Sequence, residues 1–305
     1  MKITVLGCGA MGSIYAALLS SNGNDVTVVD PNAEHIAAIK NNGLRVYGAS
    51  GDRTVKVNAY LTPPSETCDL LVIAVKGSHV ASAVAGAHCL INERSLILTI
   101  QNGLGSSDVV ASALGKERLL VGIAQGFGAS LPEPGQAHHN DMKAIRMGAY
   151  AGLDTVAVLR VASCFKAAGF DAEEADNIEA MQWEKLICNV AYSAISALTG
   201  FTVGEIMDDP QVGPISQQAA VEAWEIGKAK GVAIQVEDPV QMVRDFASRM
   251  PEAKPSVLLD IEIGRLSEVG YINGAIPLEA NKLGLAAPVN QTLTGLVRSL
   301  ELSRL

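Results

Sequence analysis

The feature that most constrains the fold is a glycine-rich run placed directly after the first strand pattern. Residues 2–6 (KITVL) predict a strand, and residues 10–21 predict a helix. A GxGxxG run joins the two: Gly7, Cys8 and Gly9 lie between them, and Ala10, Met11 and Gly12 are the first residues of the helix. In such a turn the first glycine allows a tight bend, the second lets the backbone approach a pyrophosphate, and the third lets the helix pack closely on the strand. Free N–H groups at the helix start then face the phosphates. In this context the run predicts a dinucleotide-binding βαβ unit.

A carboxylate follows the second predicted strand, residues 25–29. Asp30 stands where such folds place an acid that accepts hydrogen bonds from the ribose hydroxyls and repels a 2′-phosphate. Residues 31–34 (PNAE) contain no Arg or Lys that could hold that phosphate. We therefore predict NAD as the preferred cofactor, with NADP as the second choice. The competing interpretation is that Asp30 only caps the next helix.

The first half of the chain alternates short apolar runs with helical patterns. Strands are predicted at 2–6, 25–29, 69–75 and 95–100, and helices at 10–21, 33–41, 78–87 and 106–114. Such alternation predicts an α/β fold with a Rossmann-type, doubly wound parallel sheet. Residues 44–61 are expected to add strands at one edge of that sheet, and residues 136–148 to form a strand pair beyond its parallel part.

The second half is dominated by longer helical patterns, at 153–168, 177–198, 211–230, 239–249 and 288–302. Gly200, Gly231 and Gly284 stand where helices would end in a glycine C-cap. We predict a Rossmann domain over residues 1–175 and an all-helical C-terminal domain over residues 176–305.

Composition excludes several classes of partner. The 305 residues carry 32 acidic and 23 basic side chains, a net charge of −9, which argues against nucleic acid and against an anionic membrane surface. Residues 186–204 carry no charge but hold too many polar side chains for a membrane span, so a buried helix is expected. Five scattered cysteines without a CxxC pair predict no disulfide framework and no metal site, as in a cytoplasmic protein.

Polar residues also follow two other predicted strands. Lys76 comes after 69–75, and Gln101, Asn102 and Gly103 come after 95–100. Because ligands in open α/β sheets bind beyond the carboxyl ends of the strands, these residues together with the glycine run predict a cofactor groove.

In these and further motifs the chain resembles the ketopantoate reductase (2-dehydropantoate 2-reductase) family over nearly its whole length. The shared residues are GCGAMG at 7–12, Val75-Lys76, Gln101-Asn102-Gly103, Pro134-Gly135 with His138, WEKL at 183–186 with Asn189, and Ser256, Asp260, Gly264-Arg265, Ser267-Glu268 and Ile272-Asn273-Gly274. The last two groups are the most specific. The resemblance implies an NAD(P)-dependent oxidoreductase that transfers hydride between nicotinamide and C2 of a small anionic 2-oxo or 2-hydroxy acid, held in a cleft between the two domains.

The resemblance also implies roles for single residues. Lys185 matches the family's general acid toward the keto oxygen, and Glu268 is expected to hydrogen-bond that lysine or the substrate hydroxyl. An ammonium suits this task because hydride addition to a carbonyl leaves an alkoxide that needs a proton. Asn102 is expected to bind nicotinamide ribose or substrate, and Lys76 to serve the cofactor.

The remaining expected ligands belong to the substrate. Asn189 lies four residues after Lys185 and so shares its helix face. Ser256 is expected to bind the substrate carboxylate, and Ser193 stands where the family commonly has a second asparagine. Val203 and Ala253 also replace polar residues of the family, and Asp30 departs from its usual NADPH preference. These departures leave open whether the substrate is ketopantoate or a related 2-oxo acid.

Other interpretations stay open at this point. One is a catabolic NAD-dependent 2-hydroxy acid or sugar-acid dehydrogenase. Another is a β-hydroxyacid dehydrogenase, which the GFGAS segment at 126–130 disfavours because that class carries a DxPVSGG-like loop there. A non-enzymatic alternative is an NAD-binding sensor. The sequence leaves a homodimer open as well.

Overall fold

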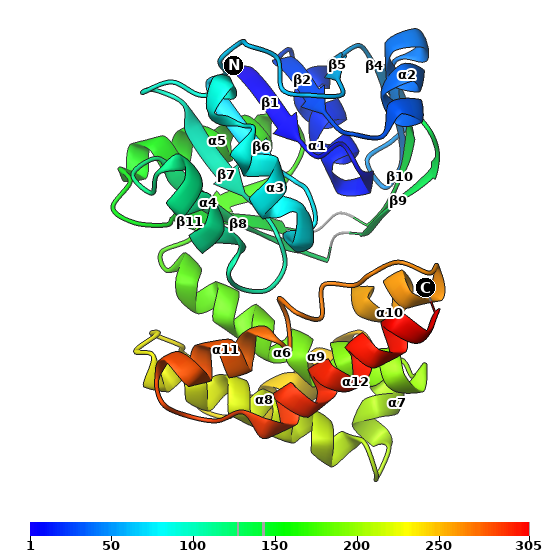
Figure 1. The fold of residues 1–305 in the computed structure, drawn as a ribbon, viewed down its shortest axis with the longest axis vertical. Helices are drawn as coiled ribbons and strands as arrows, with labels where there is room; N and C mark the ends of the chain where they lie inside the picture. Colours follow the sequence, from blue (N-terminus) through cyan, green and yellow to red (C-terminus); the bar gives the residue numbers. More distant parts are fainter. Residues whose placement is uncertain (127, 142–143, 305) are drawn as a thin grey trace. The chain divides into compact units, whose positions relative to one another are not determined.

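The computed structural model describes residues 1–126, 128–141 and 144–304, and the chain divides into two compact units (Figure 1). The first unit comprises Met1–Gln101 and Ser106–Ile178, and the second comprises Asn102–Gly105 together with the chain from Glu179 onward. Phe127 of the GFGAS segment lies outside the described residues. Each unit has its own hydrophobic core.

The first unit is built on an eight-stranded sheet in the order β12-β11-β8-β7-β6-β1-β2-β5. Neighbouring strands run parallel except β8 and β11. The strands are β1 (Lys2–Leu6), β2 (Asp25–Val29), β5 (Asn58–Tyr60), β6 (Leu70–Ile73), β7 (Leu96–Thr99), β8 (Leu119–Gln125), β11 (Ala144–Ala149) and β12 (Asp171–Glu174). Because β1 lies between β2 and β6, the chain reverses its winding direction there, which is the ligand-binding position in doubly wound sheets.

Helices connect these strands, as the Rossmann-type prediction requires. They are α1 (Ala10–Ser21), α2 (Ala33–Asn42), η1 (Gly77–His79), α3 (Val80–Ala85), η2 (His88–Leu90), α4 (Ser106–Leu114) and α5 (Thr155–Ala167). The predicted bounds of β1, α1, β2 and α4 are confirmed. The α/β fold class is confirmed too, since β6 and β7 are four-residue strands with every residue buried between covering layers.

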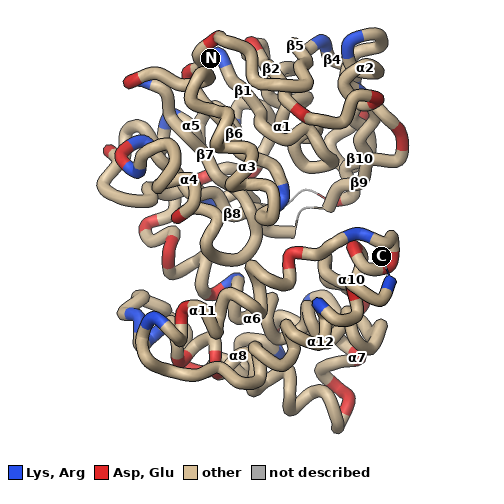
Figure 2. Tube along the Cα trace, viewed as in Figure 1, with Lys and Arg blue, Asp and Glu red and all other residues tan. Residues whose placement is uncertain are grey.

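A second sheet covers α1 on the side away from the main sheet. It has the order β4-β3-β10-β9 and consists of β3 (Leu44–Gly48), β4 (Arg53–Val55), β9 (Gly128–Glu133) and β10 (Gln136–Asp141). Helix α1 (AMGSIYAALLSS) has no charged residue and is uniformly tan in Figure 2. A helix that is apolar around its circumference is stable only when it is buried on all sides. The second sheet buries the side of α1 that the main sheet does not reach.

Two sequence predictions are corrected by this sheet. Residues 44–61 were expected to extend one edge of the main sheet, but only β5 does so, by pairing with β2, whereas β3 and β4 belong to the second sheet. Residues 136–148 were expected to form one strand pair, but β10 pairs with β9 and β3 while β11 joins β8. β10 belongs to the sheet that covers α1, whereas β11 extends the main sheet beyond β8 and packs against α5.

The second unit contains α-helices and the excursion Asn102–Gly105. The helices are α6 (Ile178–Thr199), α7 (Val203–Asp208), α8 (Gly213–Ala229), α9 (Pro239–Arg249), α10 (Ser256–Glu262), α11 (Ala275–Lys282) and α12 (Pro288–Arg304). Gly200, Gly231 and Gly284 have φ of +79°, +86° and +69°, the left-handed conformation expected of glycine C-caps. The short helices α7, α10 and α11 were missed because six to eight residues show too little periodicity to predict a helix.

Helix α6 forms the centre of the second unit, and the part of the uncharged stretch 186–204 that lies in this helix is buried up to residue 197, apart from the partly buried Asn189, whereas residues 198–200 at its end are exposed. Trp183 is 1% exposed and packs against α8 at Gly227, where an added Cβ would stand 2.8 Å from the indole Cε3. None of the helices in the described part of the chain is both long and apolar enough to cross a membrane.

Candidate active site

The three glycines of the turn after β1 have three different local geometries. Gly7 has φ of +95°, and a Cβ on it would stand 2.6 Å from the backbone nitrogen of Val75, two residues after β6. A Cβ on Gly12 would stand 1.9 Å from the carbonyl oxygen of Gly7. A Cβ on Gly9 would meet nothing within 4 Å. The first and third glycines are therefore required by the fold, and the second leaves the backbone open to a ligand.

The open side of this turn presents hydrogen-bond donors. Within the described residues, the N–H groups of Gly9, Ala10 and Met11 at the start of α1 make no hydrogen bond. Cys8 is fully buried behind them, and burial raises the pKa of its thiol to about 12, so that it packs as an apolar residue. Donors at a helix N-terminus without an acid in its first turn fit the pyrophosphate of a dinucleotide.

Asp30 lies against this turn. Its Oδ2 accepts a hydrogen bond of 2.8 Å from the Cys8 N–H, and its Oδ1 accepts one of 2.9 Å from the Asn32 N–H. Helix α2 is capped by Asn32, whose side chain accepts from the His35 N–H at 3.0 Å. The alternative that Asp30 serves as the cap of α2 is therefore wrong, and its carboxylate stands at the edge of the candidate nucleotide site.

The ends of β6 and β7 are joined by Gln101. Its Nε2 donates to the carbonyl oxygens of Ile73 at 2.7 Å and Val75 at 3.0 Å. Lys76 follows directly and begins the turn η1, where its carbonyl accepts from the His79 N–H at 2.8 Å. Gln101 thus fixes the loop that carries Lys76, a structural task that the sequence did not reveal.

Residues Asn102–Gly105 leave the first unit and pack on the second. Gly103 has φ of +80°, and a Cβ there would stand 1.9 Å from the carbonyl oxygen of Tyr271. The Leu104 N–H donates to that same oxygen at 2.9 Å, and Gln182 on α6 donates from Nε2 to the Gly103 carbonyl at 2.9 Å. The Asn-Gly pair is therefore a close backbone contact that only glycine permits.

This excursion brings Asn102 to Lys185. The Lys185 Nζ on α6 donates a hydrogen bond of 2.8 Å to Asn102 Oδ1. Burial lowers the pKa of Lys185 to about 8, and the negative charge of Glu268, in the turn between α10 and α11, acts in the opposite direction and raises it. Asn102, Lys185 and Glu268 come from three separate parts of the chain and form what we call the lysine cluster. A lysine with a pKa near the working pH is able to give and to take a proton.

The expected substrate ligands lie on two helices of the second unit. Asn189, one turn after Lys185 on α6, is partly buried, and no hydrogen bond of its side chain occurs within the described residues. Ser193, a further turn along, is 3% exposed. Ser256 begins α10 and is exposed. Their roles toward a substrate stay predictions.

A buried polar network supports the turn that carries Glu268. Asn273 is fully buried and donates from Nδ2 to the Val190 carbonyl at 2.8 Å and to Asn290 Oδ1 at 2.9 Å. Asn290 in turn donates to Glu222 Oε2 at 2.9 Å, and Glu222 also accepts from the Val289 N–H at 2.8 Å. The polar side chain of Asn273 in this turn is therefore structural, since it ties the turn to α6 and α12.

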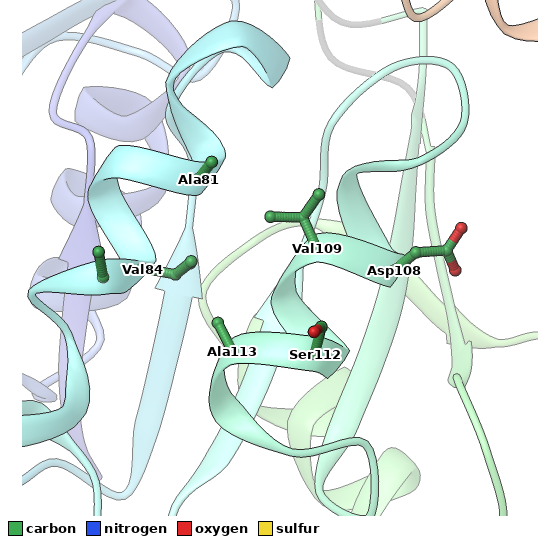
Figure 3. Close-up of a pocket in the computed structure, with 7 residues that line it drawn as sticks. Ala81, Val84, Asp108, Val109, Ser112 and Ala113 are labelled. Atoms are coloured by element: carbon green, nitrogen blue, oxygen red, sulfur yellow. The ribbon is translucent and has the colours of Figure 1, made fainter.

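A surface pocket of about 430 Å³ lies elsewhere, between α3 and α4 (Figure 3). Its lining is small and mostly apolar, with Asp108 as its charged member, and that carboxylate already accepts a 2.6 Å hydrogen bond from Tyr150. None of the predicted site residues lines it, and a carboxylate would repel an anionic acid. The pocket is not the candidate active site.

Comparisons with known proteins agree with this geometry. The family model “Ketopantoate reductase PanE/ApbA” matches residues 3–152, and “Ketopantoate reductase PanE/ApbA C terminal” matches residues 177–301. The chain is 30% identical to the 2-dehydropantoate 2-reductase of Halobacterium salinarum over 302 residues, covering 98% of each protein.

Solved structures show the same likeness. The PanE/ApbA family ketopantoate reductase from Ralstonia eutropha JMP134 superposes with a TM-score of 0.91 at 29% identity, covering 100% of this chain and 99% of that one. D-mandelate dehydrogenase, solved with NADH and anilino(oxo)acetate, has a TM-score of 0.92 at 24% identity with the same coverage, a likeness of fold alone. The two family models together match most of the chain, and a relative is 30% identical over nearly its whole length. This chain therefore belongs to the ketopantoate reductase family of NAD(P)-dependent oxidoreductases.

Proposed function

We propose that the protein reduces a small 2-oxo acid at C2 to the 2-hydroxy acid, reversibly, with NADH as the preferred reductant. The observation that carries this proposal is the lysine cluster. The Lys185 ammonium is held at 2.8 Å by Asn102 Oδ1 and has a pKa of about 8, so that both protonation states are populated near neutral pH. A non-catalytic nucleotide sensor has no use for such a group.

The residues of the turn after β1 are assigned to the cofactor. The N–H groups of Gly9, Ala10 and Met11 would hold the pyrophosphate, and Asp30 would accept hydrogen bonds from the adenosine ribose. A bound nicotinamide supplies the hydride in reduction and accepts it in oxidation. The choice of NAD rests on the position of Asp30 against the Cys8 N–H, where its charge opposes a 2′-phosphate.

Lys185 is assigned the proton transfer. In reduction its ammonium donates a proton to the oxygen of the substrate carbonyl, which becomes the 2-hydroxyl, and Lys185 is left neutral. Asn102 fixes the direction of Nζ, and the carboxylate of Glu268 keeps the proton on the lysine until it is needed. In oxidation the neutral amine takes the hydroxyl proton.

The substrate is proposed to be held by Asn189, Ser193 and Ser256. Two positions where the family commonly carries polar residues lie side by side here, because the Val203 N–H donates to the Ala253 carbonyl at 3.0 Å. The side chains of Val203 and Ala253 have no polar group, so neither offers a hydrogen bond to a ligand. Fewer polar partners favour a branched 2-oxo acid with fewer hydroxyls than 2-dehydropantoate.

A substrate panel tests the proposal. NADH and NADPH oxidation is measured with 2-dehydropantoate, with 2-oxoisovalerate as the analogue that lacks its hydroxymethyl group, and with sugar-derived 2-oxo acids. We expect turnover of at least one branched 2-oxo acid, with a higher kcat/KM for NADH than for NADPH. Tight NADH binding without turnover of any member of the panel would identify a sensor and overturn the proposal.

A further inference from the structure

A buried histidine lies behind the glycine-rich turn and has no part in the chemistry described above. His35 on α2 is 1% exposed, and its Nδ1 accepts a hydrogen bond of 2.9 Å from the N–H of Gly135, in the hairpin between β9 and β10. Its Nε2 lies 3.5 Å from the hydroxyl of Ser13 on α1. The ring therefore bridges the second sheet and the first turn of the helix that follows the glycine run.

The protonation state of this ring follows from its contacts. Burial lowers the pKa of His35, while the charge of Asp30 and the nearby carbonyl of Cys8 raise it. Because Nδ1 accepts from Gly135, the single proton of a neutral ring must sit on Nε2. His35 is thus a donor toward Ser13 and the Cys8 carbonyl.

Ser13 completes the contact to the same carbonyl. Its Oγ donates to the Cys8 carbonyl oxygen at 3.1 Å. On its other side, the Cys8 N–H donates to Asp30. Both peptide planes that flank the Cys8 Cα are therefore fixed by side chains from outside the glycine run.

The second of these planes sets the direction of a cofactor ligand. The Cys8 carbonyl and the Gly9 N–H belong to one peptide group, and this group is trans, as are all the peptide bonds that the structure describes. In a trans peptide the C=O and N–H point in opposite directions. Holding the carbonyl toward Ser13 and His35 consequently turns the Gly9 N–H outward, on the side where Gly9 is exposed.

We propose that His35, as the neutral Nε2–H tautomer, is a positioning residue for the dinucleotide: together with Ser13 it holds the Cys8 carbonyl so that the Gly9 N–H faces the pyrophosphate. The inference rests on the proposed use of the glycine-rich turn for NADH. It also gives a role to the Pro134-Gly135 pair, which takes no part in the proposed reaction. Gly135 has φ of +78°, and a Cβ on it would stand 3.0 Å from the Ala38 Cβ, so that only glycine brings this N–H up to α2 and its histidine.

Substitution of His35 by glutamine or asparagine tests the contacts of the two ring nitrogens separately. In His35→Gln the side-chain Nε2 can take the place of the imidazole Nε2 and donate to the Cys8 carbonyl. In His35→Asn the Oδ1 can take the place of Nδ1 and accept from Gly135, but nothing reaches the carbonyl. The dissociation constant of NADH, measured by fluorescence titration, is expected to rise roughly tenfold in His35→Asn and to stay within about threefold of wild type in His35→Gln. Ser13→Ala, a smaller change on the other donor, is expected to weaken NADH binding by about threefold.

The controls keep a folding defect apart from a positioning effect. His88 is exposed in η2, and His88→Asn and His88→Gln are expected to leave NADH binding unchanged. Thermal melting is recorded for every variant, and the Nε2–H tautomer is checked by long-range ¹H–¹⁵N NMR of the histidine rings. A cationic His35, equal weakening in the Asn and Gln variants, or unchanged binding in Ser13→Ala and His35→Asn would each overturn the inference. Because the readout is NADH binding, a failed substrate panel leaves this test intact.

Discussion

The glycine-rich turn and the lysine cluster are built in opposite ways. The turn is made by backbone groups within one continuous stretch, Gly7 to Gly12, and two of its glycines are demanded by contacts under 3 Å. The lysine cluster is made by side chains from Asn102, Lys185 and Glu268, which are far apart in the sequence. The first site therefore depends on the backbone conformation of one short segment, and the second depends on bringing three distant side chains together.

This difference decides how each site responds to change. A backbone site depends on φ, ψ and close packing, so its geometry is fixed once β1 and α1 form. A side-chain site depends on every segment that delivers a member, and on the electrostatic balance between burial and the nearby carboxylate. We therefore expect substitutions of Lys185 and Glu268 to change turnover without changing NADH binding, and substitutions in the turn to do the reverse.

Removal of the proton donor tests this separation most strongly. Lys185→Ala is expected to lower kcat by ~10²–10⁴ because no other group in the cluster can protonate the alkoxide. The dissociation constant of NADH, measured by fluorescence, should change by less than about twofold. Lys254→Ala, which removes an exposed lysine paired with Glu262, serves as the control. A variant at position 185 that kept wild-type turnover would remove the proposed mechanism.

The excursion that delivers Asn102 provides the next test. In Gly103→Ala the new Cβ would meet the Tyr271 carbonyl oxygen at 1.9 Å, so the loop must move and take Asn102 from Lys185. We expect kcat to fall by roughly 10–100-fold and the unfolding free energy by ~1–3 kcal/mol. Gly105→Ala is the matched control, because Gly105 also has a positive φ, +92°, but nothing within 4 Å of the added Cβ. Equal effects in both variants would show that backbone strain alone is at work.

The sequence predicted the turn in detail because every part of it is local. The strand before Gly7, the helix after Gly9 and the acid after β2 are encoded within one βαβ stretch, and the observed bounds of β1, α1 and β2 coincide with the predicted ones. The second sheet could not be predicted in the same way. Its strands lie in two stretches, 44–55 and 128–141, and the only local sign of it was the absence of charge from α1.

The residues of the lysine cluster were predicted only through the resemblance to a family. A lysine next to Trp183 and Glu184 has no local signal that separates a buried proton donor from a solvated charge. The contacts of Gln182 and Tyr271 with the excursion were missed altogether, since they join residues about 80 and 170 positions apart. Long-range side-chain contacts leave no periodic trace in a sequence.

The turn can be tested separately through cofactor choice. Asp30→Asn removes the charge that opposes a 2′-phosphate while it keeps one oxygen to accept from the Cys8 N–H. The ratio of kcat/KM for NADPH to that for NADH is expected to rise roughly tenfold, as loss of ~1.4 kcal/mol of repulsion would give. Glu34→Gln removes a carboxylate in the first turn of α2 and should leave the ratio unchanged. A constant ratio in Asp30→Asn would place the determinant of cofactor choice elsewhere.

The smallest expected effect concerns the electrostatic balance inside the cluster. The pKa of Lys185 is about 8 because burial lowers it more than Glu268 raises it. Reduction needs the ammonium, which exists below that pKa, so kcat/KM for the 2-oxo acid should fall as the pH rises through about 8. Oxidation needs the neutral amine and should rise over the same range. In Glu268→Gln the negative charge that raises the pKa of Lys185 is lost. The pH profiles of reduction and of oxidation should therefore both move to lower pH, by roughly one unit.

This shift separates an electrostatic role of Glu268 from a purely structural one. At pH 6.5 the lysine of the variant stays largely protonated, so reduction should slow by no more than a few-fold, while at pH 8.5 the loss should be clearly larger. Glu262→Gln removes the carboxylate that pairs with Lys254 and should leave both pH profiles in place. If Glu268→Gln instead lowered the rate equally at every pH, the carboxylate would act by shaping the turn between α10 and α11. The cluster would then depend on packing alone, as the glycine-rich turn does, and the contrast between the two sites would disappear.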